Sequence, residues 1–173
     1  MKKIIPMILA ALIIACCSSC REKELDYNDP DVKLFVKQLK AGTYNTRNSF
    51  GMVEVPLFTR EHVGELMEYV DDMTEISSFP LPSIYSHFGG KPRLGECILW
   101  VIETVRLDHY ASLGCKLVHS NADNYESSYF LTNDEVLEAA ALYRKWWELT
   151  QNPVQSDDLW SIDPLATSKY RWW

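Results

Sequence analysis

The chain has 173 residues, of which 47% are hydrophobic and 12% aromatic, and its formal net charge is −7 at pH 7. A chain of this length and composition can fill one hydrophobic core, so disorder is excluded for the bulk of the chain and a single domain is expected. The acidic balance argues against nucleic acid or an anionic lipid surface as a partner.

The N-terminus has the pattern of a secretory signal. Lys2 and Lys3 precede an uninterrupted apolar block, Ile4 to Ala15. A short membrane anchor is the competing interpretation, but a bilayer span needs roughly 20 apolar residues and this block is shorter. The sequence therefore predicts a signal peptide over residues 1–15.

A lipidation site follows the signal. Cys16 comes directly after Ile13-Ile14-Ala15, which places an aliphatic residue at −3 and a small residue at −1, as in the bacterial lipobox. Cys20 also follows a small residue but has a poorer −3 position, and it remains the alternative lipidated residue. The polar stretch that follows suggests a tether. We predict a lipidated cysteine and tether over residues 16–28 and a domain over residues 29–173.

Apolar residues recur at helical spacing in four segments, which predict helices over 30–41, 59–71, 92–107 and 133–149. The first follows the capping pair Asp29-Pro30, and the last begins with a capping box at Thr132-Asn133-Asp134-Glu135. Helix 92–107 is apolar around most of its circumference, although a buried strand is the competing interpretation of its core. We expect the other helices to pack around it, with Trp100 and Trp146 buried.

The remaining segments have weaker patterns. Residues 43–58 and 73–91 are expected to be long loops, and residues 150–173 an aromatic tail that wraps the domain. We predict that residues 108–131 are irregular. Two alternatives remain for this stretch: Cys115 to His119 can pair with Tyr125 to Leu131 as a hairpin, or Cys115 to His119 can form a short helix. The predicted fold class is all-α.

The sequence predicts no metal or cofactor. The four histidines lack the paired spacing of metal ligands. Cys97 and Cys115 are the cysteines of the folded part, and an exported protein can bridge such a pair. Two buried free thiols are the favoured interpretation, with a disulfide as the alternative.

Glu96 and Glu103 are the candidate acid and base, because they flank Trp100 on one stripe of the central helix. Their spacing corresponds to about 10.5 Å of helix rise, whereas glycosidases place their carboxylates about 5 to 5.5 Å or about 6.5 to 9.5 Å apart. The favoured alternative is that each forms an i, i+3 ion pair, Glu96 with Arg93 and Glu103 with Arg106. We therefore assign no catalytic residue.

The central and last helices, RLGECILWVIETVRL and DEVLEAAALYRKWWEL, together with Asp163-Pro164-Leu165, resemble small uncharacterised bacterial lipoproteins built from HEAT- or armadillo-like helical hairpins. This resemblance implies an α-helical superhelix with no assigned activity.

The expected function is a lipid-anchored, non-enzymatic binding or assembly module of the bacterial cell envelope. The surplus of aromatic residues suits a protein or glycan partner, although most of these residues are expected in the core. A glycan-acting hydrolase using Glu96 and Glu103 is the alternative. The expected location is the outer membrane, on either its periplasmic or its surface face.

Lipidation can be tested by growing cells that express the protein with radiolabelled palmitate. We expect the label to enter the protein and to disappear in Cys16→Ala, because the thiol of that residue carries the acyl chain. Label that persists in Cys16→Ala but disappears in Cys20→Ala would move the anchor, and label that persists in both variants would refute the tether.

Overall fold

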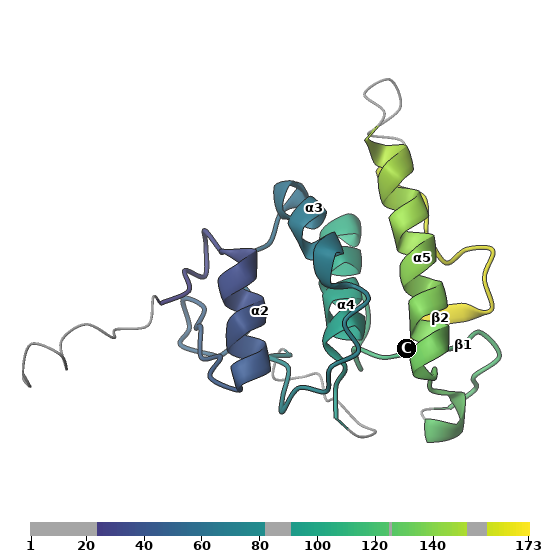
Figure 1. Ribbon diagram of the computed structural model, residues 1–173, viewed down its shortest axis with the longest axis horizontal. Helices are drawn as coiled ribbons and strands as arrows, with labels where there is room; N and C mark the ends of the chain where they lie inside the picture. Colours follow the sequence, from purple (N-terminus) through teal and green to yellow (C-terminus); the bar gives the residue numbers. More distant parts are fainter. Residues whose placement is uncertain (1–23, 82–90, 125, 152–158) are drawn as a thin grey trace, which may run out of the picture.

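The computed structural model describes residues 24–81, 91–124, 126–151 and 159–173. Three helical layers lie side by side in Figure 1: α2, then α3 with α4, then α5. A small antiparallel sheet lies beside α5. The elements in chain order are α2 (Val32–Ala41), η1 (Arg60–His62), α3 (Val63–Leu66), η2 (Met67–Tyr69), α4 (Leu94–Leu107), β1 (Leu117–His119), η3 (Ser127–Tyr129), α5 (Asn133–Thr150) and β2 (Tyr170–Trp172), where η marks a 3₁₀ helix.

The prediction of an all-α fold of HEAT- or armadillo-like helical hairpins is wrong. β1 pairs with β2 in an antiparallel sheet, with Leu117 opposite Trp172 and His119 opposite Tyr170. Each strand has three residues, and Leu117 and Val118 are both buried. A strand this short without alternating burial has no period-two pattern to detect. The described residues therefore form a mixed helix and strand domain.

The two outer helices begin at side-chain caps. Asp31 caps α2 by accepting a hydrogen bond from the Leu34 amide at 2.9 Å, so α2 begins after Asp31 rather than at residue 30. Gly42 ends α2 with a φ of 68°, a conformation that favours glycine. The capping box between Thr132 and Glu135 is present at the start of α5, as predicted.

The predicted helix over residues 59–71 is broken into three short turns, η1, α3 and η2. Its apolar stripe, which includes Val63 and Leu66, is nevertheless buried. The end of this segment lies very close to α4, because a Cβ atom on Gly95 would lie 2.3 Å from the Val70 carbonyl oxygen. The Gly95 amide also donates to the Asp72 carbonyl oxygen at 2.7 Å. Glycine at position 95 permits this contact.

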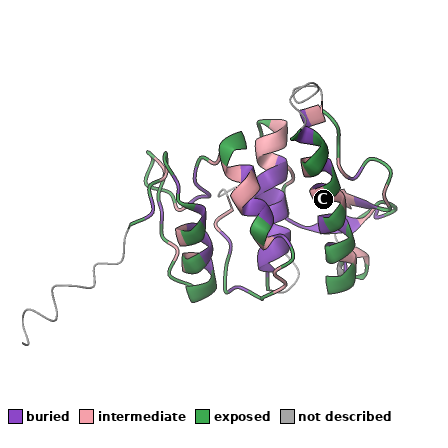
Figure 2. Ribbon diagram, turned by 45° about the horizontal axis from the view of Figure 1, so that its top comes forward, coloured by how far each residue is buried: buried purple, intermediate pink, exposed green. Residues whose placement is uncertain are grey.

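Helix α4 forms the centre of the domain, as predicted. It begins at Leu94, two residues later than expected, and every residue from Leu94 to Glu103 is buried. The buried colouring of α4 stands out in Figure 2, where it lies between α2 and α5. α4 contacts α3 and η2 as well as α5. Trp100 and Trp146 are both buried, which confirms that prediction.

The predicted signal peptide and both candidate lipidation residues, Cys16 and Cys20, lie outside the described residues. Of the stretch assigned to the tether, residues 24–28 are described, and Leu25 is already part of the hydrophobic core. None of the helices in the described ranges is both long enough and apolar enough to cross a membrane.

Replacing Trp100 with alanine should lower the free energy of unfolding by about 3 to 5 kcal/mol, because the side chain is fully buried and its removal leaves a large cavity. Urea unfolding followed by circular dichroism would measure this loss. Trp173→Ala serves as the control, since Trp173 is only half-buried and should cost about 1 kcal/mol. An unchanged unfolding midpoint in Trp100→Ala would show that α4 is not the central element.

Candidate functional site

A cleft of about 730 Å³ opens between the second half of α4 and the segment 55–60. A volume of this size is typical of a small-molecule site. Its apolar wall consists of Val55, Pro56, Leu57, Phe58, Trp100, Val101 and Val105. Its polar and aromatic groups are Tyr27, Thr59, Arg60, Thr104, Arg106, Asp108, His109 and Tyr110.

Tyr110 supplies the exposed aromatic face of the cleft. Its ring stacks on Trp100, with centroids 5.7 Å apart and an angle of 14° between the planes. The indole nitrogen of Trp100 donates to the backbone carbonyl and hydroxyl oxygens of Ser112, both at 3.2 Å. Because Trp100 is buried and doubly hydrogen-bonded, it holds the Tyr110 ring in a fixed orientation.

The buried carboxylate of Glu54 lies behind the tyrosines of the cleft. It accepts hydrogen bonds from the Tyr110 hydroxyl and from the Asn48 amide, the latter at 2.6 Å. Burial, together with the charge of Glu54, raises the pKa of Tyr27. Burial also raises the pKa of Tyr44, whose hydroxyl donates to the Glu54 carbonyl oxygen. These phenols therefore stay protonated and serve as hydrogen-bond donors.

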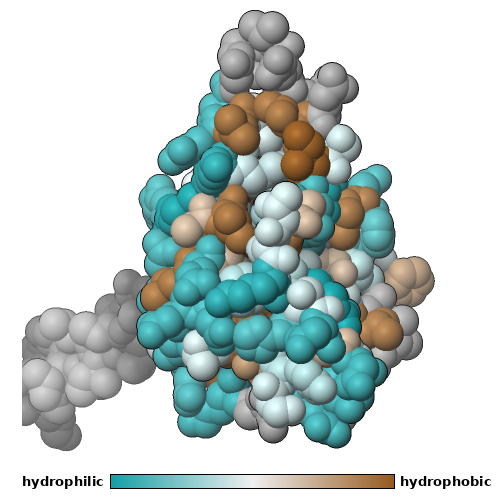
Figure 3. Space-filling model, turned by 90° about the vertical axis from the view of Figure 1, so that its right-hand side faces the viewer, coloured by the Kyte–Doolittle hydropathy of each residue, from teal (hydrophilic) through white to brown (hydrophobic). Residues whose placement is uncertain are grey.

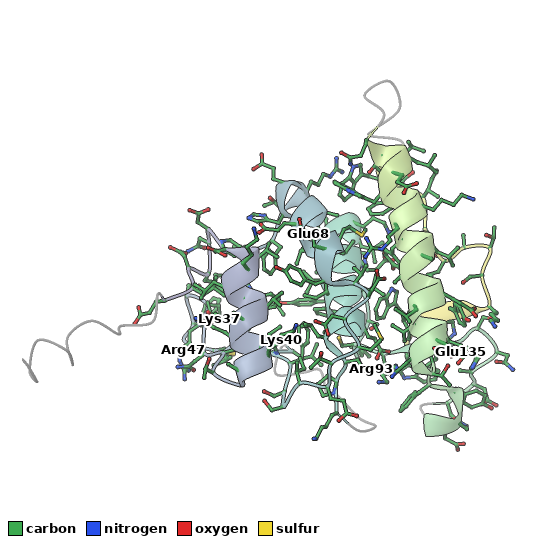
Figure 4. All side chains as sticks on the ribbon, in the orientation of Figure 1. Lys37, Lys40, Arg47, Glu68, Arg93 and Glu135 are labelled. Carbon is green, nitrogen blue, oxygen red and sulfur yellow. The ribbon has the colours of Figure 1, made fainter. Side chains whose placement is uncertain are left out.

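Glu96 lies in the core rather than in the cleft. Its carboxylate accepts hydrogen bonds from the Arg93 guanidinium at 2.7 and 3.0 Å, from the Lys116 ammonium at 3.1 Å and from the Leu117 amide at 2.9 Å. Arg93 also donates to the Leu131 carbonyl oxygen at 2.9 Å. Figure 4 shows Arg93 at the N-terminal end of α4, on the side that faces α5. Glu96 thus connects the start of α4 directly to β1 and, through Arg93, to Leu131 just before α5.

Glu103 occupies a corresponding position two turns along α4. The Arg106 guanidinium donates two hydrogen bonds to its carboxylate, at 2.7 and 2.8 Å, and these bonds raise the pKa of Arg106. The Tyr143 hydroxyl of α5 donates to the same carboxylate at 2.8 Å and accepts from the Trp172 indole at 2.8 Å. Burial, followed by the charge of Glu103, raises the pKa of Tyr143 well above its usual value.

Each glutamate therefore pairs with an arginine, as the favoured alternative predicted. Glu96 is 1% exposed and Glu103 is 3% exposed, and neither residue lines the cleft. The arrangement offers no room for a sugar between the two carboxylates. The geometry of Glu96 and Glu103 thus gives no support to the glycan-hydrolase alternative.

The two core cysteines, Cys97 and Cys115, are buried free thiols, as favoured from the sequence. Burial, followed by the contact with Cys97, raises the pKa of Cys115 well above its usual value. A protonated, buried thiol is unreactive. The pair therefore contributes apolar packing.

Glu54 and residues 55–58 belong to the stretch predicted as a loop, whereas Thr59 and Arg60 were predicted to begin a helix. Met52 to Val55 has apolar residues on both sides of Glu54 but is too short for a strand prediction. Neither the aromatic identity of Tyr27, Tyr44 and Tyr110 nor their spacing reveals that all three converge on Glu54. This part of the site follows from tertiary structure alone.

The described residues thus form a small mixed domain with an aromatic-lined cleft against its central helix. A family model described as Domain of unknown function (DUF4943) matches residues 26–173, and the chain belongs to this family. A comparison with curated proteins found no match, and neither did a comparison with solved structures. The family membership agrees with the expectation of a family without an assigned activity.

Proposed function

We propose that the protein is a lipid-anchored, non-enzymatic binding module of the bacterial cell envelope. The Cys16 lipobox supports the anchor, with Cys20 as the alternative site. The proposed location is the outer membrane, on its periplasmic or surface face. The observation that carries the binding function is the cleft between α4 and the segment 55–60.

The groups around the cleft favour binding over hydrolysis. Asp108 is the one carboxylate among the described residues that line it. Hydrolysis of a glycosidic bond generally needs two carboxyl groups on opposite sides of the bond. The Glu54 carboxylate behind the cleft is held by hydrogen bonds from the Tyr110 hydroxyl and the Asn48 side-chain amide. The cleft therefore has groups for contact and orientation without a catalytic pair.

The ligand class that fits these groups best is a glycan. The apolar face of a sugar ring can stack on the Tyr110 ring, which Trp100 holds rigid. Sugar hydroxyls can pair with donors and acceptors at the rim of the cleft, which include Tyr27, Thr104 and His109. A small number of polar groups around an apolar wall is the usual composition of a ligand site. A protein partner is the alternative occupant.

Glycan binding can be tested by titrating the purified mature protein with soluble envelope and plant oligosaccharides while recording tryptophan fluorescence. Ligand stacked on Tyr110 should change the emission of Trp100 directly beneath it. Tyr110→Ala should bind about tenfold more weakly, because the stacking face is lost.

Tyr110→Phe is the matched control, since it retains the ring but removes the hydroxyl that donates to Glu54. Its affinity should stay close to that of the unaltered protein. No saturable change with any oligosaccharide, or equal affinity in Tyr110→Ala, would contradict the assignment of the cleft to glycans.

A further inference from the structure

A hairpin-like turn over residues 48–52 presents two large apolar side chains to solvent. Phe50 is 84% exposed and Met52 is 45% exposed. Arg47 and Val53 form an antiparallel bridge at the base of the turn. An apolar side chain left in water forgoes the favourable free energy that its burial would supply. These two residues therefore form an apolar tip, which we call the Phe50 tip.

The turn is held in this conformation by its own hydrogen bonds. The Asn48 side-chain oxygen accepts from the Phe50 amide at 2.9 Å and from the Met52 amide at 3.1 Å. The Arg47 guanidinium donates to the Gly51 carbonyl oxygen at 2.6 Å. Gly51 has a φ of 77°, which favours glycine. The tip is thus preorganised, and Phe50 is held away from the hydrophobic core.

The Phe50 tip lies at the end of the domain where the described chain begins. The Thr46 hydroxyl donates to the Leu25 carbonyl oxygen at 3.4 Å. Glu24, Leu25, Thr46 and Arg47 also line one small hollow of about 380 Å³. Figure 4 labels Arg47 at this end of the molecule, on the side of α2 away from α4.

The distance from the lipid to this end is limited by the length of the chain. Glu24 is eight positions after Cys16, which gives a reach of roughly 30 Å when the chain is fully extended. Lipidation at Cys20 would reduce the reach to roughly 15 Å. This step rests on the lipid anchor in the proposed function. An anchored domain must therefore keep the end that carries Leu25 close to the bilayer.

We propose that the Phe50 tip inserts into the bilayer surface as a second membrane contact. The occupant of this surface is a lipid bilayer, because the short tether brings it to the tip. Apolar insertion supplies the binding, since cations such as Lys37 and Arg47 at this end are offset by Glu24 and by the acidic balance of the chain. The contact adds to the lipid anchor, and it orients the domain on the bilayer.

Two other exposed apolar residues lie far along the sequence from the tether. Leu149, at the end of α5, and Ile162 are about half exposed. Figure 3 shows the α5 side of the molecule, where hydrophobic residues are interspersed with hydrophilic ones. Residues of this kind provide matched controls for the tip.

The test uses the mature chain from residue 16 with Cys16→Ser and Cys20→Ser, so that no lipid is attached. This chain is sedimented with vesicles of phosphatidylcholine and phosphatidylethanolamine. We expect it to bind the vesicles, and we expect the further variant Phe50→Ser/Met52→Ser to bind about tenfold more weakly. The control Leu149→Ser/Ile162→Ser should bind as the parent does, and all three should share one melting temperature.

A parent chain that does not sediment with vesicles would overturn the proposal, as would equal binding by the Phe50→Ser/Met52→Ser variant. An equal loss in the control variant would attribute the binding to general apolarity rather than to the tip. Crosslinking of the tip to an envelope protein, together with unchanged vesicle binding in Phe50→Ser/Met52→Ser, would identify a protein rather than the bilayer as the partner of the tip. The palmitate experiment reports on the anchor separately, so failure of the anchor and failure of the tip give different results.

Discussion

Two carboxylates buried on α4 govern how the C-terminal half of the protein packs. Burying a charge is costly unless it is paired and hydrogen-bonded. Glu96 meets this requirement with Arg93 and Lys116, and Glu103 meets it with Arg106 and the Tyr143 hydroxyl. The partners come from three parts of the chain, which are α4 with the residue before it, Lys116 beside β1, and α5. The two carboxylates are therefore fully satisfied only when those parts occupy their native positions. The two glutamates therefore specify the arrangement of β1, α5 and β2 around α4.

The same helix supplies one wall of the cleft. Trp100, Val101, Thr104 and Val105 line the cleft, whereas Glu96 and Glu103 serve the ion-pair networks. Arg106 takes part in both, because it pairs with Glu103 and also lines the cleft. The geometry of the cleft thus depends on α4 being held rigidly by its buried charges. The two glutamates that were catalytic candidates by residue type act here as structural supports for the wall of the cleft.

Local signals in the sequence predicted the elements that depend on neighbouring residues. The capping box of α5, the apolar run of α4 and the i, i+3 pairs of Glu96 and Glu103 were all confirmed. Each of these features involves residues within one or two helical turns of each other. Their physical basis is therefore visible in a single stretch of sequence.

Features that depend on distant residues could not be predicted. The strand at Leu117–His119 pairs with Tyr170–Trp172, so neither segment has a partner until the chain has folded. Lys116 reaches Glu96 from outside α4, and Tyr110 reaches Glu54 across an even longer separation. The all-α prediction failed for the same reason, because three-residue strands are defined by their pairing rather than by their composition.

The most direct test of the structural role of these carboxylates is a double-mutant cycle on Glu103 and Arg106, read by urea unfolding. Glu103→Gln leaves the Arg106 guanidinium buried without its counter-charge and should cost about 3 to 5 kcal/mol. Glu103→Gln/Arg106→Met should cost clearly less than the sum of the two single variants, because no buried charge is left unpaired. A Glu103→Gln protein of unchanged stability, or single-variant losses that simply add, would contradict the account.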